Sequence, residues 1–343
     1  MEQWSLAIIM SEYKITIKNT ETMKDGTVKT WLYEPIVPEG VQWVTTRCGE
    51  PSKLTFTVIK DEIIKFNEGD EVRFTCDKKP IFFGYVFEKR RDKNHHIEVT
   101  CYDPSYYLKT KENFLAANIR ADQVIARLLS DMHLKIKSLI NTGYVIHKFA
   151  QSDKTLFEIF QDALDQTLIA TGELYCLYWD FDGFVLKHHK DMITDLLICK
   201  DTAENFDYST SINGNTFNSI VVKSDNGERG DKKQTSVYVL NDFPSQSKWG
   251  VLQMEVDVQA GTTPQQTAQI VMSMYNRVSR TISVSGALGD IRVRGGSSVF
   301  VDLYLGDHTC SQTLLVTQAT HTFKGGHHSM ELTLIDGRGF YGK

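Results

Sequence analysis

The chain has 343 residues, with 38 Lys and Arg, 43 Asp and Glu, and a net charge of −5 at pH 7. This balance gives no general basic field, so specific nucleic-acid binding is not expected, and the local run Lys89-Arg90-Arg91 is interpreted as a solvated strand flank. Six scattered cysteines without a CxxC pair favour buried thiols in a reducing compartment. No apolar run of bilayer length is present, and Glu2 stands where a secretory signal would be basic, so a soluble protein made in the cytoplasm is expected.

Short strands are predicted in the first hundred residues. Turn signals such as Glu68-Gly69-Asp70 separate alternating or apolar β runs. These runs cover residues 13–17, 53–59, 71–76, 81–88 and 97–102. Strands at this spacing are typical of a small antiparallel barrel or sandwich, and residues 1–106 are predicted to form a first β-barrel domain.

The periodicity becomes helical near residue 107. Asp122 is expected to cap one amphipathic helix and Asp153 a second, each with an apolar face. Residues 174–179 and 184–187, joined by Asp182-Gly183, predict a hairpin. Residues 107–205 are therefore predicted to be an inserted α/β domain.

The β signal then returns for the rest of the chain. Thr263 before Pro264 predicts one helix at about residues 263–280 within this part. Strands are expected at residues 219–224, 235–240, 252–258, 298–305, 314–323 and 329–335. Residues 206–343 are predicted to be a second β-barrel domain, which gives an α+β, mainly β protein with two similar small antiparallel barrels.

The two barrels are predicted from an internal repeat. Glu98, Thr100 and Asp103 have the same spacing as Glu331, Thr333 and Asp336, and each set follows a histidine pair. Upstream of each, a glycine precedes a valine by three residues, at Gly69 and at Gly296. Two similar β units in one chain allow a small symmetric oligomer to build a ring of twice its nominal symmetry, which indicates architecture more than catalysis.

One segment has the composition of a catalytic motif. Asp180-Phe181-Asp182-Gly183 follows an apolar strand and resembles the nucleophile motif of haloacid-dehalogenase-type phosphatases, in which one aspartate attacks phosphorus. A hairpin turn is the favoured interpretation, because Asp-Gly is a strong turn signal and a strand follows it directly. A phosphatase-like hydrolase using Asp180 and Asp182 is the alternative function.

The histidine pairs suggest a metal-site hypothesis. His96 and Glu98 share one strand face, but adjacent histidines point to opposite faces and the second copy changes the spacing to Glu331. Polarity at strand ends is the favoured role, also for His188 and His189. No HExxH motif, ordered Cys-His signature or phosphate loop is present, so no catalytic, metal or cofactor-binding residue and no cofactor are predicted.

Several stretches, in order, resemble the opening barrel of a known family. They are Leu54-Thr55-Phe56-Thr57-Val58, Gly69-Asp70-Glu71-Val72, Ile81-Phe82-Phe83-Gly84-Tyr85-Val86, and Val99-Thr100-Cys101-Tyr102-Asp103 with Leu108 following. The family is that of phage tail hub proteins of the late control protein D type, which includes the N-terminal half of type VI secretion spike proteins. Gln151-Ser152-Asp153 and the run from Asn215 to Val222 look most like its prophage and R-type bacteriocin branch. The resemblance covers roughly residues 40–336, and the first forty residues match it poorly.

The resemblance implies a homotrimer whose six barrels form a ring. Such a ring adapts a sixfold tail tube, or a tube-initiator protein, to a threefold central spike, while the inserted domain meets other baseplate proteins. It implies a virion or tailocin baseplate, assembled in the bacterial cytoplasm, without catalytic residues or membrane contact. A structural hub is therefore the first hypothesis, the hydrolase the second, and a secreted carbohydrate-binding β protein the third.

Overall fold

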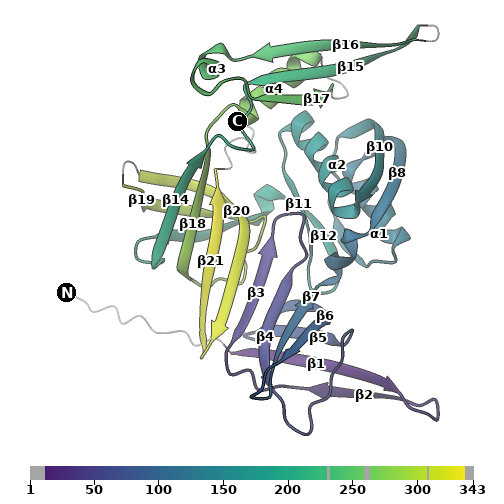
Figure 1. Ribbon diagram of the computed structural model, residues 1–343, viewed down its shortest axis with the longest axis vertical. Coiled ribbons are helices and arrows are strands. Elements are labelled where there is room, and N and C mark those ends of the chain that lie inside the picture. The colour runs from purple at the N-terminus through teal and green to yellow at the C-terminus, as the bar shows by residue number, and fades with distance from the viewer. Residues whose placement is uncertain (1–11, 230–231, 259–262, 307–308, 337–343) are drawn as a thin grey trace.

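The computed structural model describes residues 12–229, 232–258, 263–306 and 309–336. Strands dominate these residues and helices are few, which confirms the mainly β, α+β class (Figure 1). Within the described residues, thirteen strands form one large sheet: β1 (Tyr13–Thr22), β2 (Val28–Tyr33), β3 (Val41–Thr46), β4 (Lys53–Ile59), β5 (Glu71–Cys76), β6 (Lys79–Arg91), β7 (His96–Tyr102), β13 (Ile193–Cys199), β14 (Asn205–Ser211), β18 (Ser279–Leu288), β19 (Ser298–Tyr304), β20 (Thr309–Lys324) and β21 (His327–Ile335).

The pairing order explains how these strands divide. The main path is β14-β18-β21-β20-β3-β4-β7-β6-β5-β1-β2, with β19 on β20 and β13 on β19. Strands β4 and β5 coincide with the predicted runs, because Leu54, Phe56 and Val58 alternate inward on one and Val72 and Phe74 on the other. β1 and β2 place residues 13–33 at one end of the sheet, where the sequence carried no family motif.

Among the described residues, strand pairing does not close either of the two predicted barrels. Instead β3 pairs with β20, so the two halves of the chain share one continuous sheet. Two separate barrels therefore remain a prediction.

The segment after β7 folds beside this sheet (Figure 1). It contains η1 (Pro104–Lys109), β8 (Lys111–Arg120), α1 (Ala121–Asp131), β9 (Ile136–Leu139), β10 (Val145–Thr155), α2 (Leu156–Thr171), β11 (Tyr175–Trp179), β12 (Phe184–His188) and η2 (His189–Met192). β8 pairs with β10, and β11, β12 and β9 form a three-stranded sheet. The antiparallel pair β11 and β12 confirms the predicted hairpin.

Both predicted helices of this segment exist, but the predicted caps are wrong. Asp122 lies in the first turn of α1, where its carboxylate accepts hydrogen bonds from Arg120 Nε (3.0 Å) and Thr142 Oγ1 (2.8 Å). α2 is capped by Thr155, which forms a reciprocal capping box with Glu158. Asp153 instead lies at an irregularity of β10 with φ of 54°.

A further three-stranded sheet was not foreseen. It comprises β15 (Ser219–Arg229), β16 (Lys232–Asn241) and β17 (Gln253–Asp257), with the helices α3 (Phe243–Trp249) and α4 (Pro264–Tyr275). The predicted strands of this region therefore exist but pair with one another, and Ala268 and Val271 of α4 pack on them. The whole group is inserted between β14 and β18, which pair directly.

The helices of this insertion correct two expectations. Thr263 caps α4 with Pro264 in the first turn, as predicted, but the helix ends at Tyr275 and not near residue 280, because β18 already begins at Ser279. α3 was missed, although Asp242 caps it by accepting from Ser245 N.

The sequence repeat has a structural counterpart in two matching sets of strands. We call β3–β7 the first β unit and β14 with β18–β21 the second β unit. The first pairs in the order β3-β4-β7-β6-β5 and the second in the order β14-β18-β21-β20-β19. Every one of these pairs is antiparallel. The correspondence therefore covers each unit from end to end.

The match extends to single hydrogen bonds. Gly69 N donates to Val86 O, and Gly296 N donates to Val316 O, both at 2.8 Å. The two glycines have φ of 91° and 97°, a region that favours glycine because it has no Cβ. These are the glycines that the sequence pattern marked.

Strand register fixes the rest of the correspondence. Directly after Val86 and directly after Val316, the ladder to the next strand shifts register. The residue paired with Val86 precedes Asp103 by two positions, and the residue paired with Val316 precedes Asp336 by two positions. Asp103 and Asp336 are thus equivalent by register, and their superposition is expected.

Candidate functional site: the junction of the two β units

One strand pair, β3 with β20, joins the two β units (Figure 1). Its ladder runs from Gln318 opposite Thr46 to Phe323 opposite Val41. Phe323 is fully buried, and its ring lies 4.9 Å from that of Phe74 in an edge-on arrangement. The second unit thus supplies part of the core of the first unit, so the two are held in a fixed relation.

A buried arginine lies beside this junction. Arg294 places its guanidinium 3.7 Å from the centre of the Tyr178 ring and donates from Nη2 to Trp179 O at 3.2 Å. It lines a cavity of about 40 Å³ together with Asp103. Burial lowers the pKa of Arg294, and burial raises the pKa of Asp103 to about 7.

Two buried donors at this cavity have no hydrogen-bond partner among the described residues. They are Arg294 Nε and Trp179 Nε1. A cavity of this size holds about two or three water molecules. Water can therefore satisfy these donors, and the group can act as a polar link between the second unit and the α/β segment.

A histidine pair occupies the other side of the junction. His321 Nε2 lies 2.8 Å from Val293 O, and His321 Nδ1 lies 2.9 Å from His328 Nε2. Since a carbonyl only accepts, His321 donates from Nε2; when both rings are neutral, its Nδ1 accepts from His328 Nε2. Burial lowers the pKa of His321 to about 3 and that of His328 to about 4.

These neutral histidines predict a loss of stability in acid. The unfolded rings take up protons near pH 6.5 and the folded rings only near pH 3 to 4, so their contribution is complete above pH 6.5 and declines as the pH falls. For His321 the decline is at most about 1.4 kcal/mol per pH unit. Asp103 acts in the opposite sense, because its raised pKa makes the folded state bind a proton more readily.

Urea denaturation of the His321→Gln variant isolates this effect, because glutamine can still donate to Val293 O and accept from His328. We expect the variant to lose less stability than the natural chain between pH 7 and pH 5. An identical pH profile would contradict the assignment of a buried neutral pair.

The aspartates of the phosphatase-like motif lie in the β11–β12 turn. Asp180 N donates to Gly183 O at 2.9 Å, as in a closed turn. Lys137 Nζ lies 2.9 Å from Asp180 Oδ2 and 2.8 Å from Asp182 Oδ1, and all three side chains are more than two-fifths exposed. These ion pairs lower the pKa of Asp182, which opposes use of its carboxyl group as a general acid.

We therefore expect Asp180→Asn to leave assembly and phosphate release unchanged. An exposed ion pair contributes about 0–1 kcal/mol, so the free energy of unfolding should fall by no more than that. Malachite-green detection of phosphate from a generic ester is the measurement. Release by the pure protein that disappears in the variant would favour the hydrolase.

The predicted histidine positions are separated in the structure. His96 lies 3.7 Å from Asp92 at the β6–β7 turn, and Glu98 is exposed further along the strand. His189 is buried and its ring nitrogens lie 2.9 Å from Gly296 O and 3.1 Å from Ser298 Oγ. Among the residues the structure describes, no group of three or more His, Cys, Asp or Glu is placed to hold a metal ion.

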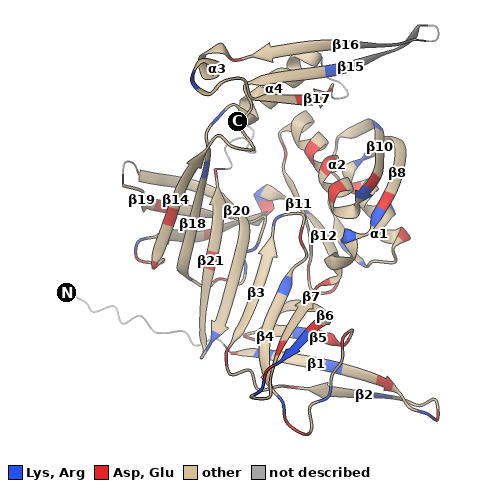
Figure 2. Ribbon diagram, viewed as in Figure 1, with Lys and Arg blue, Asp and Glu red and all other residues tan. Residues whose placement is uncertain are grey.

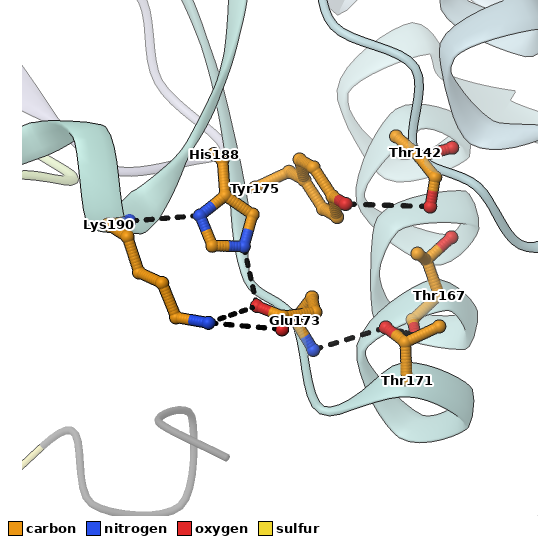
Figure 3. Close-up of polar contacts among 7 residues, drawn as sticks. All are labelled: Thr142, Thr167, Thr171, Glu173, Tyr175, His188 and Lys190. Atoms are coloured by element: carbon orange, nitrogen blue, oxygen red, sulfur yellow. Dashed lines mark hydrogen bonds and ion pairs between the residues drawn. The ribbon is translucent and has the colours of Figure 1, made fainter.

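His188 closes a polar network at the end of α2. Figure 3 shows His188 and Lys190 directed at the carboxylate of Glu173, with His188 Nε2 at 2.5 Å and Lys190 Nζ at 3.1 Å. Glu173 N donates to Thr171 Oγ1 at 3.1 Å, directly after a left-handed Gly172. The network ties the helix end to β12, which is a structural role.

Charges are dispersed over the described elements, and no basic face is evident in this view (Figure 2). Where helices are described, none has the length and apolarity needed to span a membrane. The residues of greatest structural interest, His321 and Arg294, were not singled out from the sequence. The β3–β20 pairing reveals His321, and the contacts with Tyr178 and Trp179 reveal Arg294, because each joins segments that lie far apart in the chain.

Comparisons with known proteins agree with this architecture. The family model described as YQBQ-like matches residues 41–335. The phage-like element PBSX protein XkdQ of Bacillus subtilis (strain 168) is 28% identical over 318 residues, covering 89% of this chain and 94% of that protein.

Solved structures share the fold. The 43 kDa tail protein of prophage MuSo2 from Shewanella oneidensis has a TM-score of 0.65 at 11% identity, covering 96% of this chain and 100% of that one. The E. coli c3393 protein, a component of the type VI secretion system, has a TM-score of 0.50 at 10% identity, and the match covers 93% of this chain and 75% of that one. The resemblance to phage tail proteins is confirmed. The chain belongs to the YQBQ-like family.

Proposed function

We propose that this protein is a structural component of a phage-like tail, and that it forms the trimeric central hub of a contractile-tail baseplate. The match of its two β units in strand order, glycine hydrogen bond and strand register carries the proposal. Three copies would supply six similar units, so a threefold assembly would present nearly sixfold symmetry on one side. The B. subtilis relative belongs to a phage-like element, and the S. oneidensis neighbour is a tail protein.

In this proposal the two β units build the ring and the other layers face outward. The tail tube or its initiator protein binds the sixfold side, and a central spike binds the threefold side. Residues 107–205, and the β15–β17 layer inserted in the second unit, contact other baseplate proteins. The protein acts within the baseplate of a virion or tailocin, and catalysis has no part in this role.

Gene deletion in the producing strain tests the proposal. We expect no sheathed particles by negative-stain microscopy without this protein, and full recovery when the natural gene or its Asp180→Asn variant is supplied. Normal particles in the deletion strain would refute the structural role.

A further inference from the structure

The two β units differ in how their strand edges are covered. β3 has β4 on one edge and β20 on the other, whereas its counterpart β14 pairs with β18 alone among the described strands. β20 pairs with β3 through Gln318–Phe323. The equivalent residues of β6, which begin at Glu88, pair with β7, but no described strand occupies their other edge. Each unit therefore has one edge that no described strand covers, although the equivalent edge of the other unit is covered.

We propose that β14 of one copy pairs antiparallel with residues Glu88–Arg91 of β6 in a second copy. This repeats between copies the β3–β20 pairing found within the chain, and it rests on the ring proposed above. A closed ring would then leave neither edge exposed, which removes the hazard of uncontrolled strand pairing.

The repeat gives the register on the β6 side. Arg90 pairs with Glu98, and Thr320 pairs with Glu331. Glu98 and Glu331 are the repeated glutamates, so Arg90 of β6 corresponds to Thr320 of β20.

The repeated threonines give the register on the β14 side. Two successive strand pairings lead from Thr100 on β7 across β4 to Gln42 on β3. The equivalent two pairings lead from Thr333 on β21 across β18 to Asp207 on β14, so Gln42 corresponds to Asp207. Two residues further along, Val44 corresponds to Ser209. Because Val44 faces Thr320 within the chain, Ser209 of one copy should face Arg90 of the next.

The chemistry of the two edges is complementary. Arg90 and Asp207 are both exposed, and in this register they are diagonal neighbours on one sheet face, within reach of an arginine side chain. Trp43 and His321 lie with ring centres 4.8 Å apart at the junction within the chain, and their counterparts are Tyr208 and Arg91. An arginine over a tyrosine ring is a favourable contact.

The loop beneath β6 has a counterpart in the second unit that coexists with strand pairing. Lys89 Nζ donates to Phe66 O at 2.8 Å, and in the second unit His321 Nε2 donates to Val293 O at the same distance. Phe66 and Val293 each precede the matched glycine by three residues, so the same loop supports both strands. In the second unit that loop coexists with the β3 pairing.

Cysteine cross-linking of the full chain tests the register. In a Cys48→Ser background, Arg90→Cys with Ser209→Cys should give covalent dimers and trimers on mild oxidation, because facing strand residues meet disulfide geometry. Arg90→Cys with Thr210→Cys is the matched control and should remain single chains, since neighbouring side chains point to opposite faces. Val44→Cys with Thr320→Cys should cross-link within one chain.

Charge reversal gives a second readout that needs no disulfide. Arg90→Glu should raise the dissociation constant of the assembly roughly tenfold, and Arg90→Glu with Asp207→Arg should restore it. A trimer that neither cross-links at this register nor responds to the reversal would overturn the strand pairing while leaving the hub intact. A protein that stays monomeric, alone and in particles, would overturn both.

Discussion

Replacing Phe323 with alanine is expected to lower the free energy of unfolding by about 3–5 kcal/mol. The ring is fully buried, lies edge-on to Phe74 at 4.9 Å and stacks on His328 at 4.1 Å, so its removal leaves a cavity that these neighbours cannot fill. Urea denaturation followed by tryptophan fluorescence and far-ultraviolet circular dichroism measures the change.

The same variant tests whether the two β units unfold together. Phe323 belongs to the second unit by sequence and to the core of the first by packing, so its loss should separate the transitions seen by the two probes. Tyr304→Ala is the control, because Tyr304 is 66% exposed on the second unit and should change stability by at most about 0.5 kcal/mol. Equal losses in both variants would contradict the junction described here.

Gly295→Ala should destabilise the protein by about 3 kcal/mol. A Cβ at this position would lie 2.2 Å from Thr46 C and 2.5 Å from Arg47 N, which are backbone atoms at the end of β3. The shift needed to relieve this overlap would also disturb the bond from Gly295 N to Thr45 Oγ1, now 2.9 Å. Thermal unfolding monitored by circular dichroism measures the effect.

Gly49→Ala is the matched control for this substitution. A Cβ at Gly49 would meet no atom within 4 Å, but the φ of this residue is 83°, so the variant carries backbone strain of about 1–2 kcal/mol and no overlap. A loss in Gly295→Ala no greater than in this control would show that the close approach to β3 is not real.

Local patterns predicted the strands well, because alternation reports which side of a strand is buried. β4 and β5 have the predicted bounds for this reason. The helix caps were less predictable. Asp122 and Asp153 both have suitable side chains, but Asp122 is held by Arg120 and Thr142, and Thr155 offers α2 a capping pair with Glu158.

Long-range pairing was beyond local patterns. Nothing in the sequence of β15–β17 distinguishes strands of a separate sheet from strands of the second unit, since both alternate in the same way. The repeat was the exception, because duplication writes the same pairing twice. It located the equivalent glycines and aspartates. The packing of His321 against Trp43, by contrast, depends on the pairing of β20 with β3 and became visible only in the fold.

The oligomeric mass of the intact protein tests the central claim most directly. Size-exclusion chromatography with light scattering should give about three times the 39.1 kDa of the chain for the protein alone, and that mass plus the mass of the spike for its complex. Cryo-electron microscopy of particles should place three copies in one ring of six β units. A well-behaved monomer at high concentration, together with particles that contain no ring of this protein, would contradict the account.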